Sequence, residues 1–168
     1  MSDNHDLTMG VLYPSKYLKA DDLRGKPVTV TIAGVALDDV VMAGGSHEQK
    51  VVISLAKTLK LWIAGKTNGH SLAVLLGSDG HQWIGKRVVL IADVDRLGRD
   101  VVPCIRVQSS PDAPVARASA YEQAWRGTRE RGALVARLKV ALALLDMNRA
   151  ALPPIDTATT TTREPGED

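Results

Sequence analysis

Residues 59–77 read LKLWIAGKTNGHSLAVLLG, and their hydrophobic period changes from that of a strand to that of a helix. Alternate positions are apolar at the start, which predicts a strand whose core face is formed by Leu59, Leu61 and Ile63. A helical stripe then follows, formed by Leu72, Leu75 and Leu76. Thr67 or Asn68 can cap this helix, because a side-chain oxygen accepts from a free backbone N–H, and Gly77 can end it.

Two strands are expected before this stretch and two after it. Residues 28–32 alternate cleanly, and Gly34 then predicts a bulge before the alternation resumes. A turn at residues 44–46 leads to a second strand, whose core face is formed by Val51, Ile53 and Leu55. The last two strands flank a hairpin loop at residues 96–99, and Pro103 predicts an edge or a bulge in the final strand.

The predicted order is therefore three strands, one helix and two strands. A helix between the third and fourth of five antiparallel strands is typical of the OB fold, so we expect a mainly β chain with a five-stranded OB-type barrel. A mixed sheet covered by one helix is the alternative. The expected organisation is a disordered leader (1–10), an OB-fold domain (11–108), a linker (109–114), a helical arm (115–150) and a disordered acidic tail (151–168).

The helical arm carries an apolar stripe that includes Leu134, Leu138, Leu142 and Leu145. Gly127 and Gly132 weaken its middle and can divide it in two. The stripe within residues 134–145 has two interpretations. It folds back on the barrel of its own chain, or it is a surface for oligomerisation or for a protein partner, with the barrel as scaffold.

Composition places few limits on function. The formal net charge is +2, and the positive excess lies in residues 115–150, with seven Lys or Arg against three Asp or Glu. There is no Phe, so the core must be mainly aliphatic. Cys104 is the single cysteine and is expected to be a buried small apolar residue in a reducing cytoplasm. The histidines do not have the paired spacing of metal ligands, so we expect no metal or cofactor. The apolar stretch 133–145 is too short to span a bilayer, so we expect no membrane partner.

Residues near the second and third strands suggest a surface for single-stranded nucleic acid. If the core face of the third strand is as above, Lys60 and Trp62 lie together on the outer face, where OB folds bind oligonucleotides. Bases would stack on Trp62 and phosphates would contact nearby cations, namely Lys50, Lys57, Lys60, Lys66, Arg96 and Arg99. The alternative for Trp62 is a ring packed under the N-terminal segment or the arm.

A second candidate cluster consists of Trp83, Lys86 and Arg87. A Trp that precedes Ile-Gly at the start of a strand more often closes the bottom of a barrel, so Trp83 is better explained as a core residue.

Catalytic chemistry finds little support. Gly65-Lys66-Thr67 imitates the end of a phosphate-binding loop, but that motif needs a glycine at position 60, which is Lys, and a loop where residues 61–64 are a hydrophobic strand. No nucleophile, base and orienting acid can be nominated as a set. We therefore expect no catalytic residues and no enzyme activity.

Several short blocks also resemble a family of small phage- and prophage-encoded proteins. They are residues 13–23 (YPSKYLKADDL), 25–32 (GKPVTVTI), 66–68 (KTN), 83–87 (WIGKR) and 105–107 (IRV). The resemblance implies an OB-like domain over residues 11–108 and a role with single-stranded DNA. We therefore expect a non-enzymatic, sequence-tolerant binding protein that acts in phage or prophage replication or recombination, in the cytoplasm of a bacterial host. Single-stranded DNA is the expected partner, and RNA is the alternative.

Overall fold

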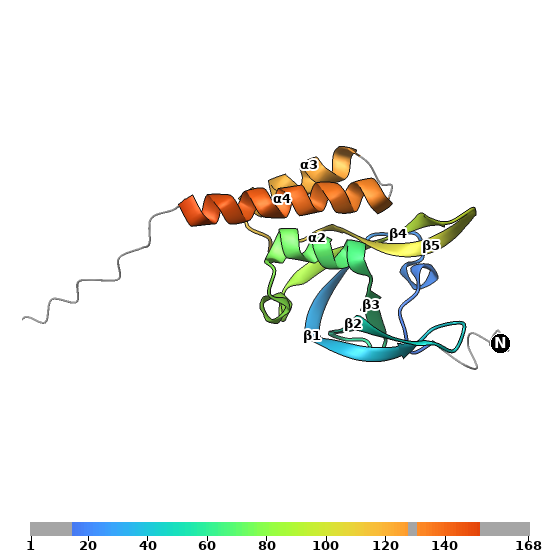
Figure 1. The fold of residues 1–168 in the computed structure, drawn as a ribbon. Coiled ribbons are helices and arrows are strands. Elements are labelled where there is room, and N and C mark those ends of the chain that lie inside the picture. Colours follow the sequence, from blue (N-terminus) through green and yellow to red (C-terminus); the bar gives the residue numbers. More distant parts are fainter. Residues whose placement is uncertain (1–14, 128–130, 152–168) are drawn as a thin grey trace, which may run out of the picture.

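The computed structural model describes residues 15–127 and 131–151 and contains a five-stranded antiparallel open sheet (Figure 1). The strands are β1 (Val28–Val41), β2 (His47–Leu55), β3 (Leu61–Ala64), β4 (Arg87–Leu97) and β5 (Asp100–Ser109). The helices are α2 (Lys66–Leu76), α3 (Val115–Gly127) and α4 (Arg131–Ala151), with short 3-10 helices η1 (Ala20–Leu23) and η2 (Gly80–Trp83). The predicted order of three strands, a helix and two strands is confirmed. The expected leader (1–10) and residues 152–168 of the expected tail lie outside the described residues.

The strands lie in the order β3-β2-β1-β4-β5, so β3 and β5 are the two edges. No ladder joins β3 to β5 in the described part of the chain, and the sheet is therefore open. The position of β5 confirms the edge strand that Pro103 predicted. The outer edge of β3 is partly covered, because Leu61 exchanges backbone hydrogen bonds of 2.8 and 3.0 Å with Leu18 and Lys16.

A bulge allows β1 to pair with both β2 and β4. Its register with β2 shifts between Ile32 and Gly34, and its first residues pair with β4 instead. A Cβ atom at Gly34 would lie 2.7 Å from Oγ of Ser54, so a side chain there would force the Ser54 side chain to move. The bulge predicted from Gly34 is confirmed, and it bends β1 across the sheet (Figure 1).

The predicted orientation of the third strand is wrong. Trp62 pairs with Ile53 on the core face and is 1% exposed, whereas Leu59 precedes β3 and is 99% exposed. Four consecutive apolar residues, 61–64, form this strand, so alternation alone could not choose its inner face. A shift of one residue exchanges the two faces of a strand, and the register with β2 places Trp62 inside.

The predicted cap of α2 is also wrong. Gly65 is the N-cap residue and supplies no side chain, while Thr67 and Asn68 lie buried in the first turn. The Asn68 side chain instead contacts β5: its Nδ2 donates to the Ile105 carbonyl at 2.8 Å, and its Oδ1 accepts from the Val107 N–H at 3.3 Å. Gly77 ends the helix with φ +107°, as predicted.

The C-terminal arm folds back over α2. It divides in two after Gly127, as the glycines predicted, and α3 and α4 lie side by side above α2, away from β1–β3 (Figure 1). Leu134 and Leu138 are fully buried in the same core cluster as the sheet, and Leu142 and Leu145 pack against it half-buried. Leu134 and Leu138 therefore form an internal contact, while the partner surface expected within residues 134–145 stays a prediction for the side chains of α4 that remain exposed. No helix in the described residues has the length and apolarity to cross a membrane.

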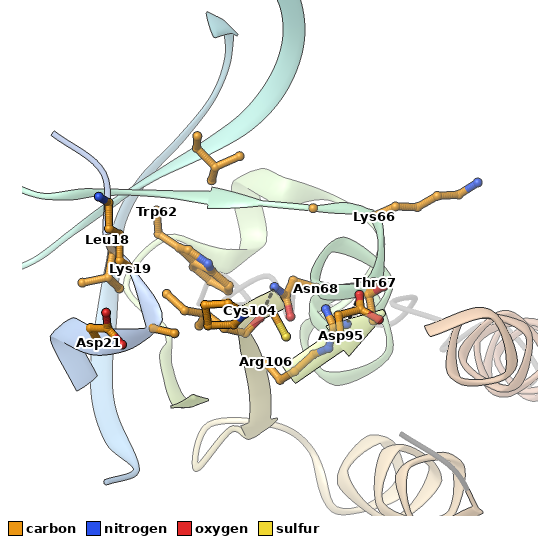
Figure 2. A pocket seen from close by; sticks show the side chains of 15 residues that line it. Leu18, Lys19, Asp21, Trp62, Lys66, Thr67, Asn68, Asp95, Cys104 and Arg106 are labelled. Carbon is orange, nitrogen blue, oxygen red and sulfur yellow. Dashed lines mark hydrogen bonds and ion pairs between the residues drawn. The ribbon is translucent and has the colours of Figure 1, made fainter. Parts of the chain in front are cut away.

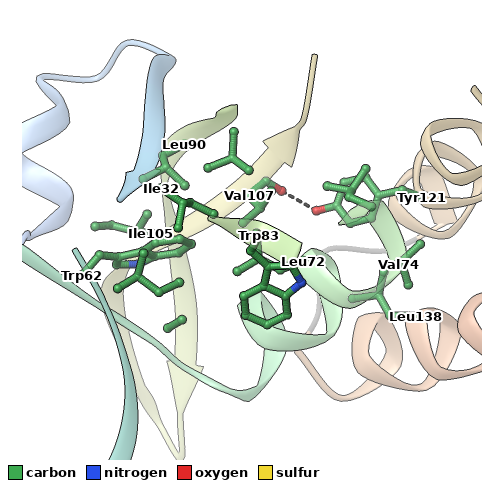
Figure 3. Packing of buried hydrophobic residues seen from close by; sticks show 14 of the residues in the cluster. Ile32, Trp62, Leu72, Val74, Trp83, Leu90, Ile105, Val107, Tyr121 and Leu138 are labelled. Carbon is green, nitrogen blue, oxygen red and sulfur yellow. Dashed lines mark hydrogen bonds between the residues drawn. The ribbon is translucent and has the colours of Figure 1, made fainter. Parts of the chain in front are cut away.

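The core extends from Trp62 through Leu72 to Tyr121 and Leu138 (Figure 3). Tyr121 of α3 is buried, its hydroxyl donates to the Val107 carbonyl of β5, and its oxygen lies 3.3 Å from Ser71 Oγ of α2. Burial raises the pKa of Tyr121 to about 12 from its ordinary value of 10.0. One side chain thus joins the arm, the helix and the sheet.

We expect Tyr121→Phe to lower the free energy of unfolding by roughly 1–2 kcal/mol, because the Val107 carbonyl loses a buried partner. Since the folded state favours the neutral phenol, the Tyr121 contribution is complete below pH 10 and is lost as the pH rises through 12. Urea denaturation at neutral and alkaline pH measures both effects. Tyr17→Phe, at a half-buried ring, is the control, and an equal loss in the two variants would contradict this role.

Candidate functional site

The tryptophans predicted to stack on bases are not accessible. Trp62 is buried in the sheet, and Trp83 is buried with its Nε1 donating to the Gly77 carbonyl at 2.8 Å. The core interpretation of Trp83 is therefore right, and the proposed stacking platform at Trp62 is wrong. A buried ring cannot receive a base without displacing its own core contacts.

Some of the predicted phosphate contacts are already occupied by carboxylates. Lys60 pairs with Asp22 at 2.7 Å, and Lys50 pairs with Glu48 at 2.5 Å. In the second cluster Lys86 is exposed, while Arg87 donates to Asp112 through its backbone and its guanidinium. These hydrogen bonds lower the pKa of Asp112 to about 2. Arg87 thus fastens the segment after β5 to the start of β4.

Four of the predicted cations remain exposed and make no ion pair among the described residues: Lys57, Lys66, Arg96 and Arg99. Arg96 and Arg99 lie at the tip of the β4–β5 hairpin, where Gly98 adopts φ +66°. The β1–β2 and β4–β5 hairpins project to the same side of the molecule, with η1 between them (Figure 1).

A cavity of about 500 Å³ lies between the two edge strands of the sheet. Trp62 and Ile63 line it from β3, and residues 103–106 line it from β5. Residues 18–21 and the first turn of α2 contribute the rest of the wall. Figure 2 shows the polar side chains that gather beside this turn, which are Thr67, Asn68, Asp95 and Arg106. The Lys66 side chain extends away from them into solvent (Figure 2).

An ion pair is buried in the wall of this cavity. Nη2 of Arg106 donates to Oδ2 of Asp95 at 2.7 Å, and their side chains are 7% and 13% exposed. The second carboxylate oxygen, Oδ1, accepts from the Arg96 N–H at 2.9 Å. Asp95 therefore has a hydrogen bond on each oxygen and holds the Arg106 guanidinium in place.

The cavity wall contains one thiol and several hydrogen-bonding side chains. Cys104 lies in the wall, but burial raises the pKa of its thiol, which keeps it protonated at neutral pH. No group of metal-binding side chains occurs among the described residues. The lining offers hydrogen-bond donors and one fixed ion pair.

Sequence reasoning overlooked Thr67, Asn68, Asp95 and Arg106 as a group. A signal was present, because alternation places Asp93 and Asp95 on one face of β4, and a two-residue loop at 98–99 puts Arg106 on the same face of β5. The contact of β5 with α2 had no local signal, since Asn68 and Val107 are 39 residues apart.

Comparisons with protein-family models, curated proteins and solved structures find no match for this chain. Function is therefore inferred from the site.

We expect Trp62→Ala to lower the free energy of unfolding by roughly 3–5 kcal/mol, because it removes a large ring from the core. Leu59→Ala is the matched control and should change it by less than about 0.5 kcal/mol, because that side chain is in water. Urea denaturation of both variants measures the difference. The opposite order of effects would show that the register of β3 is wrong.

Proposed function

We propose that this chain is a non-enzymatic OB-type protein that binds single-stranded nucleic acid along the cavity between β3 and β5. The strand order supports this proposal, because three consecutive strands, a helix and two further strands follow the OB arrangement. OB folds bind oligonucleotides on strands 2 and 3 and between the loops of their two hairpins. The cavity lies beside β3, and both hairpins project on one side of the molecule.

The observation that carries the proposal is a set of exposed cations that make no ion pair among the described residues. Lys66 lies at the rim of the cavity, and Arg96 and Arg99 lie at the tip of the β4–β5 hairpin, whose residues Asp95 and 103–106 line one wall. Phosphates contact such side chains and release their counterions, which supplies affinity without sequence preference. Since Trp62 and Trp83 are buried, binding depends on phosphate contacts more than on stacking, and we expect it to be weak at high salt. A role in phage or prophage replication or recombination belongs to the same proposal.

The double variant Arg96→Ala/Arg99→Ala should weaken the binding of a labelled single-stranded oligonucleotide several-fold at low salt. Its plot of log affinity against log salt should become shallower by about 1.4, because each lost phosphate contact removes about 0.7. Fluorescence anisotropy over a salt series measures both quantities.

Arg137→Ala/Lys139→Ala makes the same change of charge on the exposed side of α4 and should leave binding almost unchanged. An equal loss in both double variants would mean that only net charge matters. No anisotropy change for the unmodified chain at low salt would reject the proposal.

A second candidate function is self-association through the outer side of the arm. Val140, Leu144 and Met147 of α4 are exposed at helical spacing, beside a groove of about 560 Å³ between α3 and α4. Leu134 and Leu138 of the predicted stripe are buried and take no part in this surface, but Leu145 of the same stripe lines the groove. Contiguous exposed apolar side chains of this kind often mark contact surfaces.

Self-association predicts that the full chain forms an oligomer whose mass, measured by light scattering, falls on dilution. Leu144→Asp should give a monomer, because it places a charge within the apolar surface. Leu97→Asp, at an equally exposed leucine on the β4–β5 hairpin, should keep the oligomer. A monomer at every concentration would exclude this function.

A further inference from the structure

The N-terminal end of α2 presents free donors to the cavity. The first N–H groups of a helix have no partner within it, and the first such bond in α2 is Gly69 N–H to Gly65 carbonyl at 2.9 Å. Gly65 offers no side chain to accept from the earlier amides. The helix macrodipole adds partial positive charge at this end, which favours an anion.

Thr67 supplies a second and independent observation. This residue is 2% exposed, and its hydroxyl makes no hydrogen bond to any described residue. Among the described residues, every side-chain N or O atom that is completely shielded from solvent has a hydrogen-bond partner. Oγ1 of Thr67 therefore keeps some exposure to solvent, and it faces the cavity that Thr67 lines.

Arg106 of β5 lines the cavity beside this turn, and it also has donors without a partner among the described residues (Figure 2). It is 6% exposed and lines the cavity, yet only Nη2 donates, to Asp95. By the same reasoning its Nε and Nη1 keep some exposure to solvent, so their hydrogens are available to a ligand. A guanidinium held by a carboxylate on one side is well placed to donate to an oxyanion on the other.

The carboxylates of the wall do not cancel these donors. Asp95 already accepts a hydrogen bond on each oxygen, and Asp21 on η1 is exposed to solvent. Lys19 and Lys66 at the rim add two positive charges. With the Arg106–Asp95 pair counted as neutral, the wall keeps a small positive excess.

We propose that this cavity binds a phosphate group, held by the first-turn amides of α2, the Thr67 hydroxyl and the free N–H groups of Arg106. All of these groups can donate, and phosphate oxygens accept several hydrogen bonds at once. Only the origin of the phosphate group rests on the proposed function, which identifies it as a phosphate of a nucleic-acid strand. Lys60 and strand β3 occupy the positions where the phosphate-binding loop of nucleotide hydrolases needs glycine and free amides, so this site is not a loop of that kind.

The test is a titration of the full chain with inorganic phosphate against chloride at constant ionic strength, followed by two-dimensional amide NMR. We expect saturable shifts centred on the amides of Lys66, Thr67 and Asn68. Thr67→Val keeps the shape of the side chain and removes the hydroxyl, so it should weaken phosphate binding about tenfold. Thr67→Ser should retain binding, and Thr29→Val on the exposed side of β1 is the matched control.

Unfolding midpoints of the variants establish that each one is folded. No saturable shift in α2, or equal affinities for Thr67→Val and Thr29→Val, would overturn the site. Shifts spread over surface lysines instead of α2 would overturn it as well.

A parallel titration with single-stranded oligonucleotides, with and without a terminal phosphate, separates this proposal from the proposed function. Inorganic phosphate that shifts the α2 amides, while no oligonucleotide binds, would support the site and reject nucleic-acid binding. An oligonucleotide that binds and leaves these amides unmoved would support nucleic-acid binding and overturn the site. Preference for the phosphorylated strand would identify a terminal phosphate as the group that enters.

Discussion

The two hydrogen bonds of the Asn68 carboxamide hold the first turn of α2 against the free edge of β5. A carboxamide carries a donor and an acceptor, so it satisfies the same backbone groups of β5 that a neighbouring strand would use. The edge is thereby covered at this point without being paired to β3. The cavity between the edges and the orientation of the α2 amides both follow from this contact.

The scarcity of aromatic residues explains why Trp62 and Trp83 are buried and do not form a stacking surface. With no Phe in the chain, the large rings are needed inside, and Trp62, Trp83 and Tyr121 fill the core at the sheet, below α2 and under the arm. The polar atoms of Trp83 and Tyr121 donate to backbone carbonyls, so burial leaves neither unsatisfied. These three rings are therefore not available as stacking surfaces at the cavity.

The cations themselves divide according to partners that lie far away in the sequence. Lys60 is bound by Asp22, Arg87 by Asp112 and Arg106 by Asp95. Lys66, Arg96 and Arg99 have no such partner among the described residues and remain exposed. The sequence alone does not distinguish the paired cations from the unpaired ones. The carboxylate nearest to each cation depends on how η1, β4 and the segment after β5 are arranged in the folded chain.

The sequence alone was sufficient for the features that depend on local chemistry. Alternation and the change of period after residue 64 predict the order of strands and helix. The glycines at 34, 77 and 98 predict the bulge, the end of α2 and the hairpin, and those at 127 and 132 predict the division of the arm. Only the tertiary structure decided which face of β3 is inside, since residues 61–64 are all apolar and the register with β2 makes the choice. It also decided that the leucines of α4 pack on α2 and that Asn68, Asp95 and Arg106 meet. Hydrophobic periodicity predicts that one face of an element will be buried. It does not predict which surface covers that face, because the covering residues are distant in the chain.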